Sequence, residues 1–149
     1  MHYFEKSVMI SCPAEKVFKF HSDTENLPKI TPPYIKVEIK NIDLPLKKGS
    51  KIILSIKQFG FLKTTWKIEI TDFTEFTLIT DTQINGPFKY WKHDHHFENL
   101  GLNTKMTDRI SYELPFGVAG RMINRIIIRK LIEKQFEFRH KMTKEILEK

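Results

Sequence analysis

The segment from residue 117 to residue 149 constrains the fold most, because its pattern predicts one long helix. Apolar residues recur there at helical spacing, and no residue after Gly120 would break a helix. The main apolar stripe consists of Ile128, Leu131, Ile132, Gln135, Phe138, Met142 and Ile146. A second stripe at the helix start, rotated away from the first, consists of Ala119, Met122, Ile123, Ile126 and Ile127. A helix with this much apolar surface must pack against a second layer of structure.

The upstream segments supply that layer, because they alternate apolar and polar residues as half-buried strands do. The predicted strands span residues 3–11, 34–40, 52–56, 62–71, 76–83, 90–99 and 105–114. Two short helices are expected after the first strand. One begins at Pro13 with Glu15 in its first turn, and the other covers residues 24–30 and ends before Pro32. This order of elements predicts the α+β class, with a curved antiparallel sheet wrapped on the long helix.

The chain of 149 residues is most simply one domain, residues 1–149, which is long enough to bury a substantial core. No apolar run approaches the length of a membrane span, and the first residues lack the apolar block of a secretory signal. The single cysteine, Cys12, cannot form an internal disulfide and fits a reducing compartment. We therefore expect a cytoplasmic protein.

A formal net charge of +7 raises the question of an anionic partner. On the predicted strands the lysines alternate with apolar residues, which is typical of a solvated face. The helix start is more suggestive, because five basic residues face only Glu133 there: Arg121, Arg125, Arg129, Lys130 and Lys134. A solvated face, an anionic membrane surface or acidic partner, and nucleic acid are the three interpretations. No RNA-binding or helix-turn-helix signature supports the last, so we expect no nucleic-acid partner.

The segment from residue 91 to residue 98 carries most of the candidate chemistry. Side chains alternate across a strand, so Trp91, His93, His95 and Phe97 share one face. The opposite face is entirely polar and must point to solvent: Lys92, Asp94, His96 and Glu98. The two histidines are therefore predicted to point inward, between two large aromatic side chains.

The next strand places one carboxylate, Asp108, among inward apolar residues: Met106, Ile110 and Tyr112. An inward Asp is costly unless it is paired, so Asp108 should have a partner. The candidates are His93, His95, Tyr112 and Arg139. In the preceding strand Ile79, Asp81 and Gln83 could also face inward, but the opposite parity of Phe76 and Leu78 would require a bulge.

Three interpretations of His93, His95 and Asp108 remain open. They could form a metal site, a catalytic or ligand-orienting pair, or a structural polar cluster. The metal interpretation needs a third ligand that the sequence does not fix, so we expect no cofactor and no stoichiometric zinc or iron. Trp66 and Trp91 are either core residues or walls of a pocket. Signatures of a serine nucleophile and of a glycine-rich phosphate loop are absent from the sequence.

Several short motifs match a known superfamily. They are Pro13-Ala14-Glu15-x-Val17-Phe18, Asn26-Leu27-Pro28-x-Ile30-Thr31-Pro32, Asn85-Gly86-Pro87-Phe88, Trp91-x-His93-x-His95-x-Phe97, Thr104-x-Met106-x-Asp108 and Tyr112-x-Leu114-Pro115-Phe116-Gly117. Together with the order of elements, they resemble the START-like (SRPBCC) superfamily, and within it a bacterial subgroup related to polyketide cyclase/dehydrase domains. The resemblance covers essentially the whole chain.

The resemblance implies a helix-grip fold, in which about seven antiparallel strands curve around the C-terminal helix. It also implies a cavity for an apolar ligand, such as a lipid, a polyketide or a quinone. Relatives occur fused to epimerase domains, which makes an epimerase-like protein a candidate partner. The superfamily includes both enzymes and carriers, so the resemblance does not carry a catalytic set.

Our leading hypothesis is a protein that binds or carries a hydrophobic small molecule between the sheet and the long helix. The expected ligand-binding residues are Trp66, Trp91, His93, His95, Phe97, Asp108, Tyr112, Met122 and Ile126. Met122 and Ile126 are expected at the cavity mouth, with Arg121, Arg125 and Arg129 outside as a basic rim. The alternative is a cyclase- or dehydratase-type enzyme that uses His93 or His95 with Asp108.

Overall fold

The computed structural model describes all residues from Met1 to Lys149 and contains one seven-stranded antiparallel sheet of order β1-β7-β6-β5-β4-β3-β2. The strands are β1 (His2–Ile10), β2 (Ile35–Ile42), β3 (Lys51–Gln58), β4 (Leu62–Thr74), β5 (Leu78–Asn85), β6 (Tyr90–Asn99) and β7 (Thr104–Glu113). The helices are α1 (Ala14–Ser22), the 3₁₀ helix η1 (Thr24–Ile30), α2 (Gly117–Ile123), the π-helical segment η2 (Asn124–Ile128) and α3 (Arg129–Leu147). The predicted order of elements is confirmed.

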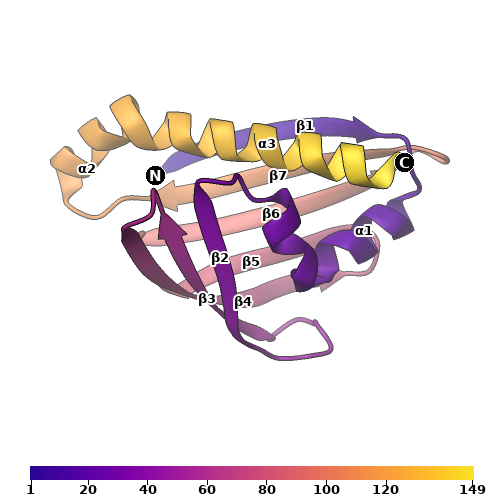
Figure 1. Cartoon of the computed structure of the whole chain (residues 1–149), viewed down its shortest axis with the longest axis horizontal. Coiled ribbons are helices and arrows are strands. Elements are labelled where there is room, and N and C mark those ends of the chain that lie inside the picture. Colours follow the sequence, from indigo (N-terminus) through magenta and orange to yellow (C-terminus); the bar gives the residue numbers. More distant parts are fainter.

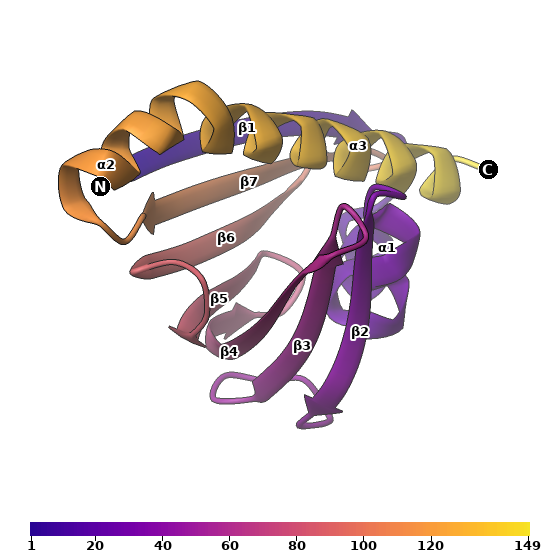
Figure 2. The ribbon, with the colours of Figure 1, turned by 60° about the vertical axis from the view of Figure 1, so that its left-hand side comes forward.

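The sheet curves around α3, as Figures 1 and 2 show. The helix runs alongside β1 and β7, and the sheet curves from these strands so that its far edge, β2 and β3, lies toward the viewer in Figure 2. The two short helices, α1 and η1, lie near the C-terminal end of α3 (Figure 1). This is the helix-grip arrangement that the sequence predicted. None of the helices combines the length and the apolar character that a membrane crossing requires.

The C-terminal helical region is continuous but contains a π-helical segment, η2. A π segment holds one residue more per turn than an α-helix, so it rotates the faces before it relative to those after it. The sequence signal for this rotation is the change of apolar stripe at the helix start. Asn124 turns inward at this point, and its Oδ1 accepts a hydrogen bond of 2.6 Å from the Tyr112 hydroxyl. This bond ties the π segment to β7.

The buried face of α3 differs from the predicted stripe. It consists of Ile132, Phe136, Arg139, His140, Thr143 and Leu147. Phe138, Met142 and Ile146, which were predicted to lead the stripe, are only half-buried. The prediction followed apolar residues alone, whereas the helix turns polar side chains, above all His140, toward a buried carboxylate of the sheet. The predicted buried face of the helix is therefore rotated by part of a turn from the observed one.

The apolar core forms two groups along the sheet. One group packs under α1 and includes Ile10, Val17, Phe18, Ile70, Phe97 and Met106. The other packs under the first half of α3 and comprises Trp91, Ile110, Tyr112, Ile132 and Phe136. Along β6 and β7, the residues between the two groups are His93, His95 and Asp108. A polar cluster thus interrupts the core at the middle of the sheet.

The contribution of the hydrogen bond from Tyr112 to Asn124 can be tested by removing the Tyr112 hydroxyl. Tyr112→Phe should lower the free energy of unfolding by roughly 1–2 kcal/mol, because it leaves the buried Asn124 oxygen without a donor. The matched control is Tyr3→Phe, since Tyr3 is 71% exposed. Urea denaturation of both variants measures the difference, and an equal stability for Tyr112→Phe and the wild-type protein would contradict this role.

Candidate functional site

Strand register brings the candidate residues together. In the pairing of β5 with β6, Asp81 lies opposite His93, and in the pairing of β6 with β7, His95 lies opposite Asp108. The predicted alternation along β6 is confirmed: Trp91, His93, His95 and Phe97 are buried, whereas Lys92, Asp94 and His96 are half-buried and Glu98 is exposed. Three neighbouring strands therefore present two imidazoles between two carboxylates.

Asp108 lies at the centre of the cluster and has no solvent exposure. His93 Nε2 is 2.8 Å from Asp108 Oδ1, and His140 Nε2, from α3, is 2.5 Å from Oδ2. His95 Nδ1 lies 2.7 Å from Oδ1, but at an angle that does not make a hydrogen bond. The predicted need for a partner is confirmed, with His140 as a partner that the sequence did not indicate. Tyr112 is not a partner, because its hydroxyl bonds to Asn124.

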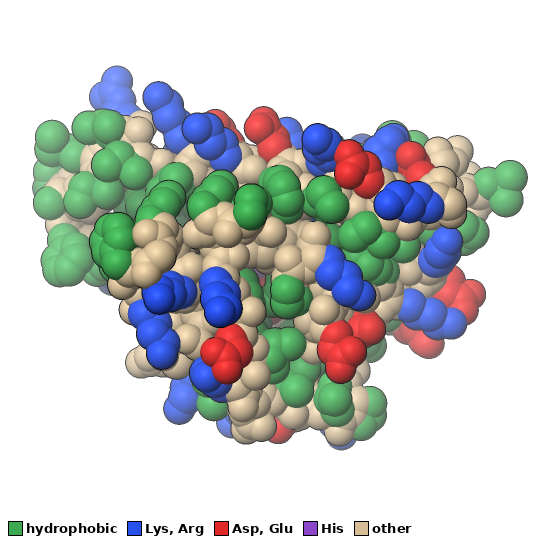
Figure 3. All heavy atoms as spheres, in the orientation of Figure 1, with side chains coloured by type: hydrophobic (Ala, Val, Ile, Leu, Met, Phe, Trp, Pro, Cys, Tyr) green, Lys and Arg blue, Asp and Glu red, His purple; other side chains and the backbone are tan.

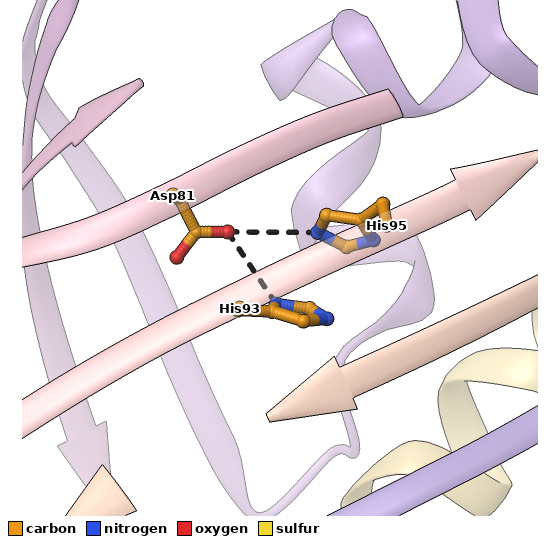
Figure 4. Close-up of side chains that lie close together, drawn as sticks. All are labelled: Asp81, His93 and His95. Carbon is orange, nitrogen blue, oxygen red and sulfur yellow. Dashed lines mark ion pairs between the residues drawn. The ribbon is translucent and has the colours of Figure 1, made fainter. Parts of the chain in front are cut away.

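Asp81 faces the two imidazoles from the other side (Figure 4). Its Oδ2 lies 3.4 Å from His93 Nδ1 and 3.6 Å from His95 Nε2. No bulge precedes Ile79 in β5, because the strand pairs with β6 without a register shift and the extra residue that it carries against β4 lies at its far end, between Gln83 and Asn85. Phe76 lies in the turn before β5, where its φ of 62° places it in the left-handed region, so its parity does not apply to the strand.

Charge within the cluster is set by burial and by its neighbours. Burial alone would lower the pKa of His95, but the attraction of Asp108 and Asp81 outweighs burial and raises that pKa to about 9. Burial opposes ionisation of Asp81 and Asp108, yet nearby imidazoles hold the pKa of each carboxyl below its ordinary value. Two carboxylates and a cationic His95 therefore occupy the cluster near neutral pH.

A cavity of about 420 Å³ borders this cluster, between the sheet and α3. Most of the residues that line it are hydrophobic, including Trp66, Ile70 and Trp91 from the sheet and Leu131 and Phe136 from α3. Its polar lining includes Asp81, His93, His95, His21 and Arg139. Figure 3 shows a narrow hollow on the face toward the viewer, bordered by hydrophobic side chains.

Two polar nitrogens at this cavity have no partner. Arg139 is only 9% exposed, and its Nε has no hydrogen-bond partner, while its guanidinium carbon lies 4.9 Å from the centre of the Phe136 ring. His21 Nε2, from α1, is likewise buried without a partner. Burial lowers the pKa of both side chains from their ordinary values. Nε–H of Arg139 could donate to an acceptor group on a ligand, and Nε2 of His21 could donate or accept according to its tautomer.

Residues 10–138 match the family model described as "Polyketide cyclase / dehydrase and lipid transport". The chain belongs to this family. The START-like resemblance inferred from the sequence is thereby confirmed. No sequence among the curated proteins matches the chain significantly.

Solved structures of low sequence identity show the same fold as this family member. A START superfamily protein from Mycobacterium smegmatis has a TM-score of 0.75 at 21% identity, covering 99% of this chain and 98% of its own. A protein from Thermus thermophilus has a TM-score of 0.74 at 19% identity, covering 97% and 95%. The ZhuI aromatase/cyclase from Streptomyces sp. R1128 has a TM-score of 0.78 at 18% identity, covering 99% and 93%.

The predicted site residues fall into three places in this polyketide cyclase-family fold. Trp66, Trp91, His93 and His95 line the cavity. Phe97, Asp108 and Tyr112 are fully buried and do not line it, so any effect they have on a ligand passes through other residues. Met122 and Ile126 are 61% and 63% exposed and do not line the cavity either.

The predicted position of Met122 and Ile126 at the cavity mouth is therefore wrong, whereas the basic residues Arg121, Arg125 and Arg129 are exposed as expected. The helix instead turns Gly120, Ile123 and Ile128 toward the cavity. The exposed residues form what we call the α2 surface: Phe116, Val118, Met122, Ile123, Ile126 and Ile127. Figure 3 shows these hydrophobic side chains gathered at the α2 end of the molecule.

Sequence reasoning missed His21 and His140 as members of the site. His140 carries a detectable signal, because it follows Phe136 by four residues and so shares its face of the helix. For His21, nothing in the local sequence of α1 indicates that its side chain reaches the cavity. Arg139 was named only as a partner of Asp108, and its cavity position depends on the tertiary fold.

The polar cluster should also contribute to stability. Asp108→Ala should lower the free energy of unfolding by roughly 1–3 kcal/mol, because it leaves the donors of His93 and His140 buried and unpaired. Glu98→Ala, on the solvent face of β6, is the matched control and should change stability little. Chemical denaturation measures both. A loss as small as that of the control would show that Asp108 does not organise the cluster.

Proposed function

We propose that this protein is a cytoplasmic carrier or sensor that binds a hydrophobic small molecule, such as a lipid, polyketide or quinone-like compound, in the cavity beneath α3. The observation that carries the proposal is an apolar cavity with unpartnered buried nitrogens at Arg139 and His21. A volume of about 420 Å³ lies within the usual range for small-molecule sites.

The cavity lining has an apolar part and a polar part, which suit a ligand with an apolar body and a polar end. Trp66, Trp91 and Ile70 offer surface to an apolar body. Arg139 places a guanidinium, which stays charged at ordinary pH, in a buried position without an ion-pair partner within 4.0 Å. An unpaired buried charge is costly, and a carboxylate or carbonyl oxygen on the ligand would satisfy it. We therefore propose a ligand whose polar end carries such an oxygen.

Replacement of Arg139 tests this division. Arg139→Met keeps the bulk of the side chain and removes the charge, so affinity for a fluorescent fatty acid should fall roughly tenfold to a hundredfold. Affinity for a neutral apolar fluorophore should barely change. Lys134→Met, on the exposed face of the same helix, is the matched control and should bind both probes normally.

Fluorescence titration of the purified protein provides the measurement. If the wild-type protein shows no saturable binding of either probe, the proposed carrier function fails. If Arg139→Met weakens the binding of both probes equally, the proposed recognition of a polar end fails.

A second candidate function is a cyclase- or dehydratase-type reaction, which the position of His93 and His95 beside the cavity favours. The pKa of His95, raised by the two carboxylates, suits a proton donor or a cation that stabilises an enolate oxygen better than it suits a base. Mass spectrometry separates the two functions: a carrier returns its ligand unchanged, whereas a dehydratase returns a product that has lost water.

The α2 surface supports transient contact with an anionic membrane. Phe116 is 80% and Val118 is 64% exposed, and Arg121 and Arg125 project from the same segment. Apolar residues bordered by basic ones are typical of segments that lie at an anionic lipid interface. Phe116 and Ile123 belong to both this surface and the cavity lining, so a ligand could pass between membrane and cavity there.

Vesicle co-sedimentation tests this contact. The wild-type protein should bind vesicles that contain phosphatidylserine and should not bind pure phosphatidylcholine. Ile126→Ser or Arg125→Glu should weaken the binding roughly tenfold or more. Leu102→Ser is the matched control, because Leu102 is 83% exposed but lies in the turn after β6. If the protein binds neither kind of vesicle, the proposed membrane contact fails, and a protein partner, such as an epimerase-like protein, becomes the candidate for this surface.

A further inference from the structure

Three potential metal ligands converge on one point at the wall of the cavity. One oxygen of Asp81 and one nitrogen each of His93 and His95 lie within 4.8 Å of one another. Figure 4 shows the carboxylate of Asp81 pointing toward both rings. We infer that Asp81, His93 and His95 form a binding site for a divalent first-row transition-metal ion.

The buried carboxylate behind the two rings supports this inference. Asp108 lies 2.8 Å from Nε2 of His93 and 2.7 Å from Nδ1 of His95. A metal ion bound here would replace the proton between His95 and Asp81, so that Nδ1 of His93 and Nε2 of His95 each turn a lone pair toward the ion while the opposite nitrogen keeps its proton. Metal-binding histidines usually donate their second ring nitrogen to a carboxylate, as His93 does to Asp108. His140 holds the second oxygen of Asp108 and so fixes the carboxylate in place.

The spacing of the donor atoms also fits a shared ion. The Asp81 oxygen lies 3.4 Å and 3.6 Å from the two ring nitrogens, which is too long for a good hydrogen bond. Ligands about 2.0–2.1 Å from a tetrahedral metal are about 3.3 Å from each other. The two separations from Asp81 are therefore close to the one that a shared metal ion imposes, and all three donor atoms lie within 4.8 Å of one another.

The donor set indicates the class of the ion. Two imidazoles with one carboxylate suit zinc or iron(II), whereas magnesium and calcium prefer sites built from oxygen alone. The carboxylates of Asp81 and Asp108 would balance the charge of a divalent cation. Three protein ligands leave further coordination positions open, and these positions would face the cavity, because Asp81, His93 and His95 all line it.

This inference revises the expectation that the protein holds no metal. That expectation rested on a third ligand that the sequence did not fix, whereas the structure places Asp81 in front of the histidines and Asp108 behind them. It also goes beyond the proposed function, because the site can bind a metal whether or not the cavity binds a hydrophobic molecule. The two proposals can therefore fail separately.

Cobalt titration of the full chain tests the site directly. The metal-free wild-type protein should bind one equivalent of Co²⁺ with visible absorption bands, and Zn²⁺ should displace it while Mg²⁺ and Ca²⁺ should not. Asp81→Ala should weaken cobalt binding by more than the roughly 10- to 100-fold that loss of an outer-shell partner typically causes. Asp108→Asn, which changes the outer shell only, should weaken it by roughly 10- to 100-fold.

His96→Ala is the matched control, because His96 is on the same strand but faces away from the cavity. It should bind cobalt as the wild-type protein does, and circular dichroism should show that all variants are folded. The inference is overturned if the wild-type protein takes up no stoichiometric cobalt or zinc. It is equally overturned if Asp81→Ala binds cobalt as tightly as His96→Ala. In either case the cluster is an ion-pair network and no metal site.

Discussion

A carboxylate with no solvent exposure, Asp108, is the constraint on which the rest of the structure depends. Leaving such a group unpaired would cost several kcal/mol, so the fold must bring donors to it. His93 and His95 reach it only when β6 pairs with β7 in one register, and His140 reaches it only when α3 presents one face. A slip of one residue in either strand would turn these groups to solvent. The polar cluster thus specifies both the register of β6 with β7 and the face that α3 packs against the sheet.

The same cluster gives the cavity its chemical character. The two imidazoles turn one edge to Asp108 and the other edge to the cavity, where Asp81 and Arg139 join them. The otherwise apolar cavity therefore has one polar wall, and Asp108 fixes its imidazoles from the side away from the cavity. This combination suits recognition of an amphipathic molecule with an oxygen at one end, and it equally suits an ion held by two imidazoles and a carboxylate.

Much of this arrangement could be predicted from local pattern. The inward direction of His93 and His95 follows from alternation, because the opposite face of β6 is wholly polar. His140 was missed because a stripe drawn through apolar residues passes beside it. The direction of the Asp81 side chain was left open, since only the structure shows that Phe76 belongs to the turn before β5 and not to the strand. Met122 was misplaced because the π-helical segment rotates the helix start, and an extra residue per turn leaves only a weak trace in the sequence.

The most direct test of this account is nitrogen-15 NMR of the histidine side chains in the metal-free protein. The account predicts that His93 and His140 carry a proton on Nε2 that exchanges slowly with solvent, because each of these protons is donated to the buried Asp108. Asp108→Asn should alter both signals and leave that of His96 unchanged. A proton found only on Nδ1 of His93, or rapid exchange at Nε2 of both rings, would contradict the central role of Asp108.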